Sequence, residues 1–564
     1  MVEVHDECVA GPGRPAAGRA ARRPAAVLAV MCLAVFAVNV DTTIVNVALP
    51  ALVRQLGATT RQLQWVVDAY LLVFAALVLT GGSLSDRLGR RAVLIVGLAV
   101  FGVGNAVAAF CTTPNQLIAV RAVTGIGAAA VFPTTLSIIT QTYRERAARA
   151  RAIGVWGATT GLAVAFGPIT GGALLERFWW GSTFLVKAPV AVLAIALVLA
   201  VVPESRDPAA PRLDVPGLVL SAFGLGALVY TIIEAPERGW TAPLTLGGLA
   251  AAALLFGLFG RRERRTPAPM LDLALFRDRR FSAASVAVTV SFFALYGFIF
   301  LITQYFQFRR GYGPLETGLR ILPVATCVAL GSVAGTLLAV RLGNKLVVST
   351  GLVSLSIAYG WVWTASGATS YIEIVGQMVF LGLGMGLTSA PATESIMGAV
   401  QTDKAGVGSA VNDATREIGG TLGVAVIGSV FASLYSARLH GLPGLPGVAS
   451  QRAAESVGAA FTVAGQLPSA AATALRDPAS TGFYDGLRAG CLVASGVALL
   501  GAAVAAVALP ARPPADLAPG PDLTASPAGS SRSARSFHTR KGRPATSDSA
   551  APTTPSTRAV RNNA

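Results

Sequence analysis

GSLSDRLGRR, residues 82–91, stands between two long apolar runs and is the stretch that decides the fold. Charged side chains are costly inside hydrocarbon, so Asp86 and the neighbouring arginines belong at a membrane surface. Glycines let two helices approach closely and let the chain reverse direction within a few residues. We therefore expect a tight, charged turn between two membrane-spanning helices. In the simpler alternative, the arginines only anchor this turn on the cytoplasmic side.

The composition is that of an integral membrane protein. Of the 564 residues, 53% are hydrophobic and 13% are charged, whereas soluble domains carry about 25% charged residues. The net charge of +17 is spread over loops and the tail, which argues against a nucleic-acid partner. The five cysteines are widely spaced and form neither a zinc pattern nor a small disulfide framework, so we expect no metal and no cofactor.

Hydropathy predicts about fourteen membrane-spanning helices. They cover residues 25–49, 62–83, 92–111, 115–140, 150–175, 181–202, 214–234, 242–260, 281–304, 315–340, 345–366, 370–396, 405–433 and 484–508. The loops on one side are rich in arginine and carry Arg87, Arg90, Arg91, Arg144, Arg146, Arg149, Arg151, Arg261, Arg262, Arg264 and Arg265. Because arginine-rich loops stay in the cytoplasm, we expect a multi-pass protein of the cell membrane with both termini cytoplasmic.

An internal repeat relates the two ends of the chain. Gly81, Arg87, Leu88, Gly89, Arg91, Gly97 and Leu98 align without gaps with Gly335, Arg341, Leu342, Gly343, Lys345, Gly351 and Leu352. Pro133, Thr135, Ser137 and Ile138 likewise align with Pro391, Thr393, Ser395 and Ile396. Repeated halves place a substrate site at their interface, near the bilayer midplane. Chance similarity between glycine-rich apolar segments is the alternative.

The repeat suggests a division of the chain. We interpret residues 25–202 and 281–509 as six-helix halves, and residues 203–280 as two inserted helices with a cytoplasmic loop. Within the second half, residues 435–482 are rich in Gly, Pro, Ala and Ser and are expected to form a long outer loop. Residues 1–24 and 510–564 are expected to be cytoplasmic tails, and the second lacks apolar periodicity and should be disordered.

Several motifs resemble those of the major facilitator superfamily. Residues 82–91 resemble its signature loop between the second and third helices. Residues 41–50, DTTIVNVALP, are similar to the end of the first span in fourteen-span drug:proton antiporters. Arg121, with Gly125 and Gly127, resembles the motif of the fourth helix. Together these motifs lie in the order that the family has.

The fifth predicted helix resembles the antiporter motif of the same family. Gly154 and the stretch GPITGG at residues 167–172 carry this resemblance, and Ala163 replaces a glycine usually found between them. The glycines of residues 406–428 extend it into the thirteenth span. The resemblance implies an all-α membrane protein with the major facilitator fold, built from two six-helix halves plus two extra helices. It also implies proton-coupled efflux of drugs, antibiotics or other small organic compounds by alternating access.

Three charged residues share a depth within the predicted spans. Asp41, Asp68 and Arg121 each lie about six to nine residues from an outer helix end, which places them about 10–13 Å below the outer surface. A carboxylate and a guanidinium at one depth offset the cost of each other's dehydration. Burial disfavours an ionised carboxylate whereas a nearby arginine favours it, so rearrangement of such a pair loads and releases a proton.

The roles of these three residues remain open from the sequence. Asp41 is expected to couple transport to protons or cations, with a structural hydrogen-bonding role as the alternative. Asp68 is a candidate for the same coupling, but beside Trp65 and Tyr70 it is equally consistent with an acid that faces headgroups. For Arg121 the coupling role is implied by the family resemblance, and a static ion pair is the alternative.

A second group of acids lies nearer the cytoplasm. Asp413 and Glu417 are four residues apart and share one helix face, with Arg416 between them. Glu394 lies near the inner end of the twelfth span, opposite Leu136 in the repeat. These acids are candidates for binding a cationic substrate or relaying protons, with pairing to Arg416 as the alternative, which stays open for Glu417 and Glu394. For Asp413 we favour a structural pairing with Arg416.

Conformational gating is expected at two places. Asp86 falls opposite Val340 in the repeat, so only the first copy carries an acid that can pair with an arginine or cap a neighbouring helix. By resemblance, Asp86 latches one conformation together with Arg87, Gly89, Arg90 and Arg91. In the fifth helix, Gly154, Gly167, Pro168, Gly171 and Gly172 are expected to permit close packing and bending.

The sequence favours a transporter over an enzyme. No phosphate-binding GxxxxGK[ST] motif is present, and the three histidines, His5, His440 and His538, lie outside the predicted spans. We expect a monomer in the lipid bilayer that moves a small-molecule substrate in exchange for protons. The alternative within transport is an exporter or importer of one metabolite, such as an amino acid or a siderophore. The substrate itself is not determined by the sequence.

Overall fold

The computed structural model describes residues 24–206, 214–266, 269, 271, 273–400, 405–440 and 447–511. All regular structure in this part of the chain is helical, and fourteen helices are long and apolar enough to cross a membrane. The expected all-α membrane fold with fourteen spans is therefore confirmed. The two tails, residues 1–23 and 512–564, lie outside the described residues, so the expectations for them stay predictions.

The helices of the first part of the chain are α1 (Pro24–Leu56), α2 (Thr60–Leu88), α3 (Arg90–Ala108), α4 (Pro114–Thr142), α5 (Arg146–Arg177), α6 (Ser182–Leu185), α7 (Lys187–Val201), α8 (Val215–Arg238) and α9 (Pro243–Glu263). Those of the second part are η1 (Leu275–Arg277), α10 (Arg279–Gln304), the π-turn η2 (Tyr305–Arg309), α11 (Pro314–Leu342), α12 (Asn344–Val362), α13 (Tyr371–Gly398), α14 (Ala405–Leu439), α15 (Gly447–Glu455), α16 (Val457–Gly465) and α17 (Ser469–Ala508). Helices α6 and α7 together form one span.

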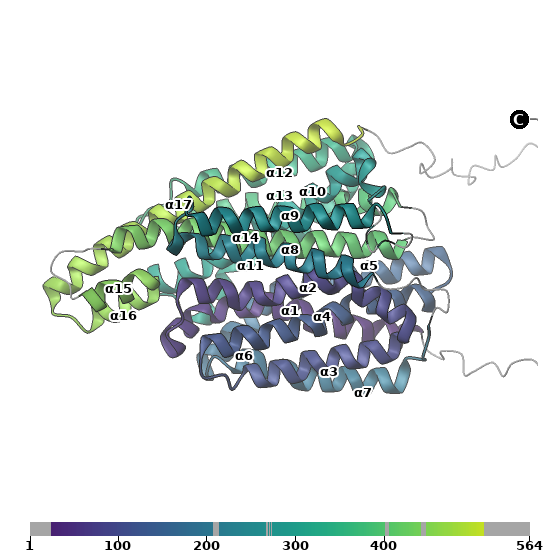
Figure 1. The fold of residues 1–564 in the computed structure, drawn as a ribbon, viewed down its shortest axis with the longest axis horizontal. Helices are drawn as coiled ribbons and strands as arrows, with labels where there is room; N and C mark the ends of the chain where they lie inside the picture. The colour runs from purple at the N-terminus through teal and green to yellow at the C-terminus, as the bar shows by residue number, and fades with distance from the viewer. Residues whose placement is uncertain are drawn as a thin grey trace, which may run out of the picture. The chain divides into compact units, whose positions relative to one another are not determined.

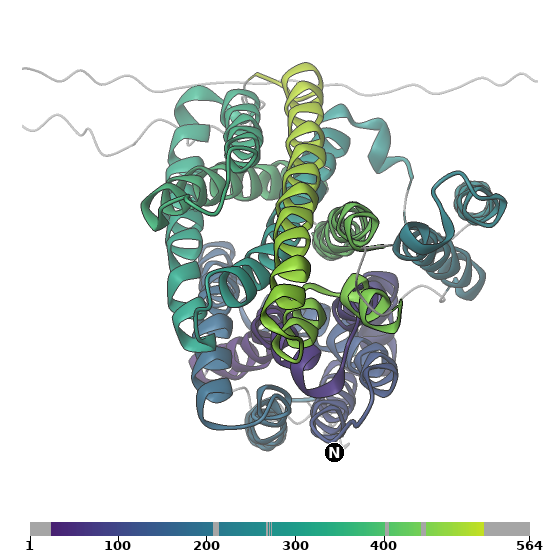
Figure 2. The ribbon, with the colours of Figure 1, turned by 90° about the vertical axis from the view of Figure 1, so that its left-hand side faces the viewer.

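The spans pack in two groups that repeat the same pairings. In the first group α1 packs on α5, α2 on α4, and α3 on both α4 and α7. In the second group α10 packs on α14, α11 on α13, and α12 on both α13 and α17. Figure 2 shows the purple and blue helices of the first group beside the green and yellow helices of the second. Helices α8 and α9 pack on each other, and α8 also contacts α2 and α14.

The turn within residues 82–91 is shorter than expected. Helix α2 continues to Leu88 and α3 begins at Arg90, so Gly89 alone reverses the chain. Its φ of 115° belongs to the left-handed region that favours glycine. Gly343, with a φ of 86°, does the same between α11 and α12 at the aligned position of the repeat. Asp86 and Arg87 therefore belong to the last turn of a helix and not to a loop.

The segment 435–482 differs from the expected irregular loop. Helix α14 ends only at Leu439, α15 and α16 follow, and α17 already begins at Ser469. Helix α17 has 40 residues and is therefore about 60 Å long, about twice the thickness of the hydrocarbon core. Figure 1 shows α15, α16 and the start of α17 beyond the left ends of the other helices. Alanine, which favours helices, accounts for much of this segment and outweighs its glycines and prolines.

Candidate functional site

A buried cluster of three charges lies inside the first group of helices. Asp41 on α1 is completely buried, and Nη1 of Arg121 on α4 lies 2.5 Å from its Oδ2. Lys187, the first residue of α7, donates a hydrogen bond to the other carboxylate oxygen. Both cations are themselves buried. Three helices that are far apart in sequence thus meet at one carboxylate.

Backbone and aromatic contacts hold the two cations in place. Nε of Arg121 donates to the carbonyl oxygen of Val66 at 3.0 Å, and its guanidinium lies 4.2 Å from the ring centroid of Tyr70. Nζ of Lys187 lies 4.5 Å from the ring centroid of Phe184. These contacts are favourable for cations that have lost their water. With one carboxylate and two cations, the cluster carries a net charge of +1.

The pairing of Asp41 with Arg121 agrees with their predicted common depth, but Lys187 was missed. A signal for it was present in the sequence. Lys187 is one of four lysines and stands inside the predicted span 181–202, in the apolar run FLVKAPV. An ionisable residue inside a span is by itself a functional candidate. What the sequence does not show is that Lys187 reaches Asp41.

Asp68 on α2 has a different environment. Its side chain is fully buried, and neither carboxylate oxygen has a hydrogen-bond partner among the described residues. The alternative in which Asp68 faces headgroups is therefore wrong. Arg121 pairs with Asp41 and not with Asp68, although its Nε contacts the backbone of Val66, two residues earlier on α2. Within the described ranges, Asp68 is a buried acid without an ion pair or a side-chain hydrogen bond.

A second set of polar groups lies between the two helix groups. Glu417 on α14 is within electrostatic range of Tyr70 on α2 and Tyr296 on α10. Its Oε2 is buried and has no hydrogen-bond partner in the described part of the chain. The hydroxyl of Thr42, next to Asp41, lies beside both phenols. An acid, two phenols and a hydroxyl from four helices thus influence one another electrostatically.

The other residues of the predicted second group, Asp413, Arg416 and Glu394, do not form one site with Glu417. Asp413 is buried and has no ion pair within 4 Å with Arg416 among the described residues, but the two side chains interact electrostatically, so the favoured structural pairing stays a prediction. The guanidinium of Arg416 lies 5.3 Å from the ring centroid of Phe292, a favourable position for a cation. Glu394 is exposed near the end of α13 and does not join this set.

The arginine-rich end of the bundle, defined by the helix ends at Arg87–Arg91 and Arg144–Arg151, has its own polar network. Nη2 of Arg90 lies 2.6 Å from Oδ1 of Asp86, which also accepts a hydrogen bond from Ser137 at 3.1 Å. The predicted pairing of Asp86 with an arginine is thus present, within a single helix group. The side chain of Arg87 is exposed.

Glu204, which follows α7, caps the neighbouring helix in place of Asp86. Its carboxylate accepts hydrogen bonds from the backbone N–H groups of Arg91, at 3.1 Å, and Ala92, at 3.2 Å. These groups belong to the first turn of α3, whose positive dipole end favours an anion. A methyl group added at Gly89 would lie 2.7 Å from Oε1 of Glu204, so the glycine also makes room for this cap.

The opposite end of the bundle holds the two helix groups together. Nε2 of Gln64 on α2 contacts Val424, Ala425 and Ser429 of α14 at 3.2–3.3 Å. Nε2 of Gln307 donates to the carbonyl oxygen of Val47 at 3.0 Å. A Cβ added at Gly172 of α5 would lie 2.6 Å from the backbone of Leu315 on α11. Glycine is required there because the two backbones nearly touch.

Close packing along α5 is limited to the half nearer this opposite end. A Cβ added at Gly167 would lie 2.0 Å from the hydroxyl of Thr43, and one added at Gly171 would lie 2.7 Å from Ile44. At Gly154 no neighbouring atom lies within 4 Å of such a Cβ, so the close packing expected at Gly154 is not found. The reason is that α5 has no partner beside this glycine in the present conformation.

Comparison with known proteins places the chain among transporters. The model of the Major Facilitator Superfamily matches residues 31–424. The chain is 36% identical to the multidrug efflux pump LfrA of Mycolicibacterium smegmatis, over 88% of this chain and 98% of that protein. It is 34% identical to the methyl viologen resistance protein SmvA of Salmonella typhimurium, over 81% and 92% of the two chains. It is 33% identical to the tetracenomycin C resistance and export protein of Streptomyces glaucescens, over 91% and 96%.

A solved structure shares the fold. A bacterial homolog to the human lysosomal transporter Spinster, in an inward-facing and occupied conformation, superimposes with a TM-score of 0.61 at 16% identity, covering 86% of this chain and 96% of that one.

Proposed function

Since the chain belongs to the major facilitator superfamily, and is a transporter and not an enzyme, we propose that it exports drugs, antibiotics or other small organic compounds in exchange for protons. Full-length relatives with these export and resistance names support the direction and the substrate class. In this proposal a monomer works in the cell membrane, with the arginine-rich end and both termini in the cytoplasm. The two helix groups alternate access to a site between them.

The observation that carries proton coupling is the contrast between Asp68 and Asp41. Both are fully buried, but Asp41 is held by Arg121 and Lys187, whereas Asp68 has no partner among the residues that the structure describes. An ionised carboxylate without water, hydrogen bonds or a cation is very costly, so Asp68 holds a proton in this conformation. Asp41 stays ionised because two cations surround it. Asp68 is therefore the proposed proton carrier.

The position of Arg121 suggests how the proton is released. Its guanidinium binds Asp41 and at the same time the backbone of Val66, two residues before Asp68 on the same helix. A small shift of α2 against α4 brings the guanidinium to Asp68 and makes the ionised form favourable there. Lys187 keeps Asp41 paired while Arg121 is away. Exchange of one arginine between two acids thus couples helix movement to deprotonation.

The substrate is proposed to bind at the polar set between the helix groups. Glu417, Tyr70 and Tyr296 offer a buried carboxyl group, which an arriving cation would favour in its ionised form, and two aromatic rings, which together suit lipophilic cations. The two faces of this set belong to different helix groups, so a bound molecule experiences their relative movement. Each proton that enters down a potential of 100 mV supplies about 2.3 kcal/mol for export.

Everted vesicles provide the test. With an imposed pH gradient and methyl viologen as the substrate, Asp68→Asn should abolish gradient-driven accumulation and substrate-induced proton release, while binding of methyl viologen to the purified variant persists. Asp485→Asn, at an acid near the opposite end that pairs with Arg438, serves as the control and should transport normally. Undiminished gradient-driven transport by Asp68→Asn would refute the assignment of the proton carrier.

A further inference from the structure

Three arginines gather at the end of the second helix group that lies opposite the arginine-rich end. Arg309 and Arg310 lie at the end of the π-turn η2, and Arg488 lies on α17. The guanidinium of Arg309 lies 5.3 Å from the ring centroid of Tyr484, also on α17. Nη2 of Arg488 donates to the carbonyl oxygen of Ala365 at 2.9 Å, and Nη2 of Arg310 donates to the backbone of the same connection between α12 and α13. The three cations thus meet around one loop and one helix.

Among the described residues, no acid compensates these three charges. None of the three arginines forms an ion pair there, and the acids of the adjoining elements are engaged elsewhere. Asp485 on α17 lies 3.0 Å from Nη2 of Arg438, and Glu373 on α13 accepts a hydrogen bond of 3.0 Å from the backbone N–H of Ser370. All three arginine side chains are half-buried. Like charges that have lost part of their water repel one another, which favours a bound anion.

The cluster lies at the depth of lipid headgroups. From Arg488 to Ala508, the last residue of α17, the helix rises about 30 Å, which equals the thickness of the hydrocarbon core. Trp361 and Trp363, at the end of α12, are 36% and 48% exposed. Exposed tryptophans are typical of the boundary between hydrocarbon and headgroups. Both observations place the three arginines at that boundary.

The face of α17 below Arg488 is apolar and exposed. Leu492 and Leu499 follow Arg488 by one and three helical turns, which puts all three residues on one face of the helix. The two leucines are 46% and 57% exposed. In a membrane-spanning helix such a face contacts acyl chains. A cation at headgroup depth thus stands directly above a surface for lipid tails.

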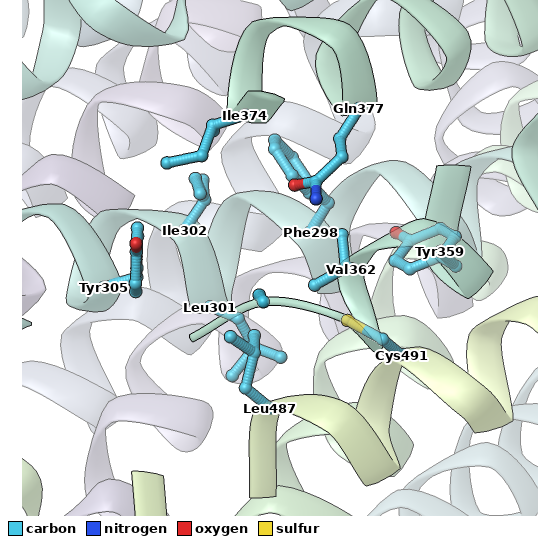
Figure 3. Close-up of a pocket in the computed structure, with 11 residues that line it drawn as sticks. Phe298, Leu301, Ile302, Tyr305, Tyr359, Val362, Ile374, Gln377, Leu487 and Cys491 are labelled. Atoms are coloured by element: carbon cyan, nitrogen blue, oxygen red, sulfur yellow. The ribbon is translucent and has the colours of Figure 1, made fainter. Parts of the chain in front are cut away.

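The interior side of the cluster has no room for an anion. Ala365 and Tyr305, which accept hydrogen bonds from Arg488 and Arg310, line a cavity together with Leu487 (Figure 3). A volume of about 30 Å³ in this cavity is open to the centres of water molecules. That is room for one or two waters and not for a phosphate group. An anion therefore reaches the arginines from the headgroup side.

We propose that Arg309, Arg310 and Arg488 bind the phosphate group of an anionic phospholipid, in the leaflet at the end opposite the arginine-rich end. Guanidinium groups bind phosphate oxygens through paired, charge-assisted hydrogen bonds. Of five N–H donors on each guanidinium, Arg488 uses one and Arg310 two in hydrogen bonds with described residues. The acyl chains lie along Leu492 and Leu499. Because the site belongs to one helix group, the lipid compensates charge there and is not transported.

A label beside the site tests the proposal in full-length protein. The five native cysteines are replaced by alanine, and Leu492→Cys carries a fluorescent label. The protein is reconstituted into phosphatidylcholine bilayers that contain a small fraction of phosphatidylglycerol or phosphatidylcholine with brominated acyl chains, which quench the label only at short range. Brominated phosphatidylglycerol should quench the label more strongly than brominated phosphatidylcholine. Arg488→Gln should lower this preference about fivefold.

Two controls separate the site from general attraction to a basic protein. Arg61→Gln removes an arginine at the same end that pairs with Glu234 and Glu237, and should leave the preference at Leu492 unchanged. A label on Leu244→Cys, at a residue 72% exposed at the start of α9, should not respond to Arg488→Gln.

Three results would overturn the proposal. The first is equal quenching by the two lipids at Leu492. The second is an undiminished preference in Arg488→Gln or, if that variant does not fold, in Arg310→Gln. The third is loss of the preference when inorganic phosphate replaces chloride at constant ionic strength, because the site would then belong to free phosphate and not to a lipid.

Discussion

Lys187 and Asp41 form a buried ion pair although they lie 146 positions apart in the sequence. The pair joins the start of α7 to the middle of α1, and Arg121 completes it from α4. The first helix group is thus held together by charges as well as by apolar packing. In the proposed mechanism the carboxylate of Asp41, flanked by two cations, stays ionised and leaves proton exchange to Asp68.

The three charges should respond unequally to replacement. Asp41→Asn leaves two buried cations without an anion and should lower the free energy of unfolding by about 3 kcal/mol. Lys187→Met should cost less, because Arg121 still pairs with Asp41. In the double variant the losses should not add, with a coupling of about 1 kcal/mol or more. Unfolding of the purified variants in detergent measures this cycle, and strict additivity would contradict the triad.

Replacing Asp68, unlike replacing Asp41, should abolish activity without lowering stability. Because the proposed mechanism keeps its carboxyl group neutral and no hydrogen-bond partner lies among the described residues, Asp68→Leu should leave the thermal midpoint unchanged or raise it. The same variant should lose proton-driven transport. The measurement is a thermal unfolding curve beside a transport assay. A large fall in the midpoint would mean that the Asp68 carboxylate has a partner that stabilises it.

At the arginine-rich end, Glu204 and Asp86 are expected to have different roles, one in stability and one in transport. Glu204→Ala removes the cap of α3 and should lower stability by about 1 kcal/mol. Asp86→Ala should instead reduce turnover more than substrate binding, because Asp86 is the proposed conformational latch. Unfolding of the purified protein measures the first effect. Transport rates beside equilibrium binding of one substrate measure the second. Normal turnover in Asp86→Ala would remove the latch from the mechanism.

Helix α5 offers a matched pair of glycines for testing the contact between the helix groups. Gly172→Val places a side chain against the backbone of Leu315 and should force α5 away from α11, which opens the end opposite the arginines. Gly161→Val, on the same helix, meets no atom within 4 Å and should be tolerated. Distances between spin labels on the two groups report the change. Identical distances in both variants would show that the α5–α11 contact does not control this end.

The spans and the buried pair of Asp41 with Arg121 could be predicted because each follows from a local rule. Long apolar runs must become helices in lipid, where backbone groups have no water to bind. A charged side chain inside such a run needs an opposite charge at the same depth, and Arg121 lies at the predicted depth of Asp41. The helical segment after Leu439 was missed because its glycines and prolines suggested a loop, whereas packing of Gly458 against Val53 and Phe308 helps to order it.

The amino-acid sequence by itself determined that this protein spans a membrane about fourteen times and that its arginine-rich segments lie at the membrane surface, because hydrocarbon imposes the same requirement on every span. Its motifs also determined which family it resembles. Only the tertiary structure decided that Lys187 shares Asp41 with Arg121, that Asp68 has no partner in the described part of the chain and that Glu204, not Asp86, caps α3. Those outcomes depend on which faces of distant helices meet. Helix contacts across more than a hundred residues are set by packing of the whole bundle, and no local pattern records them.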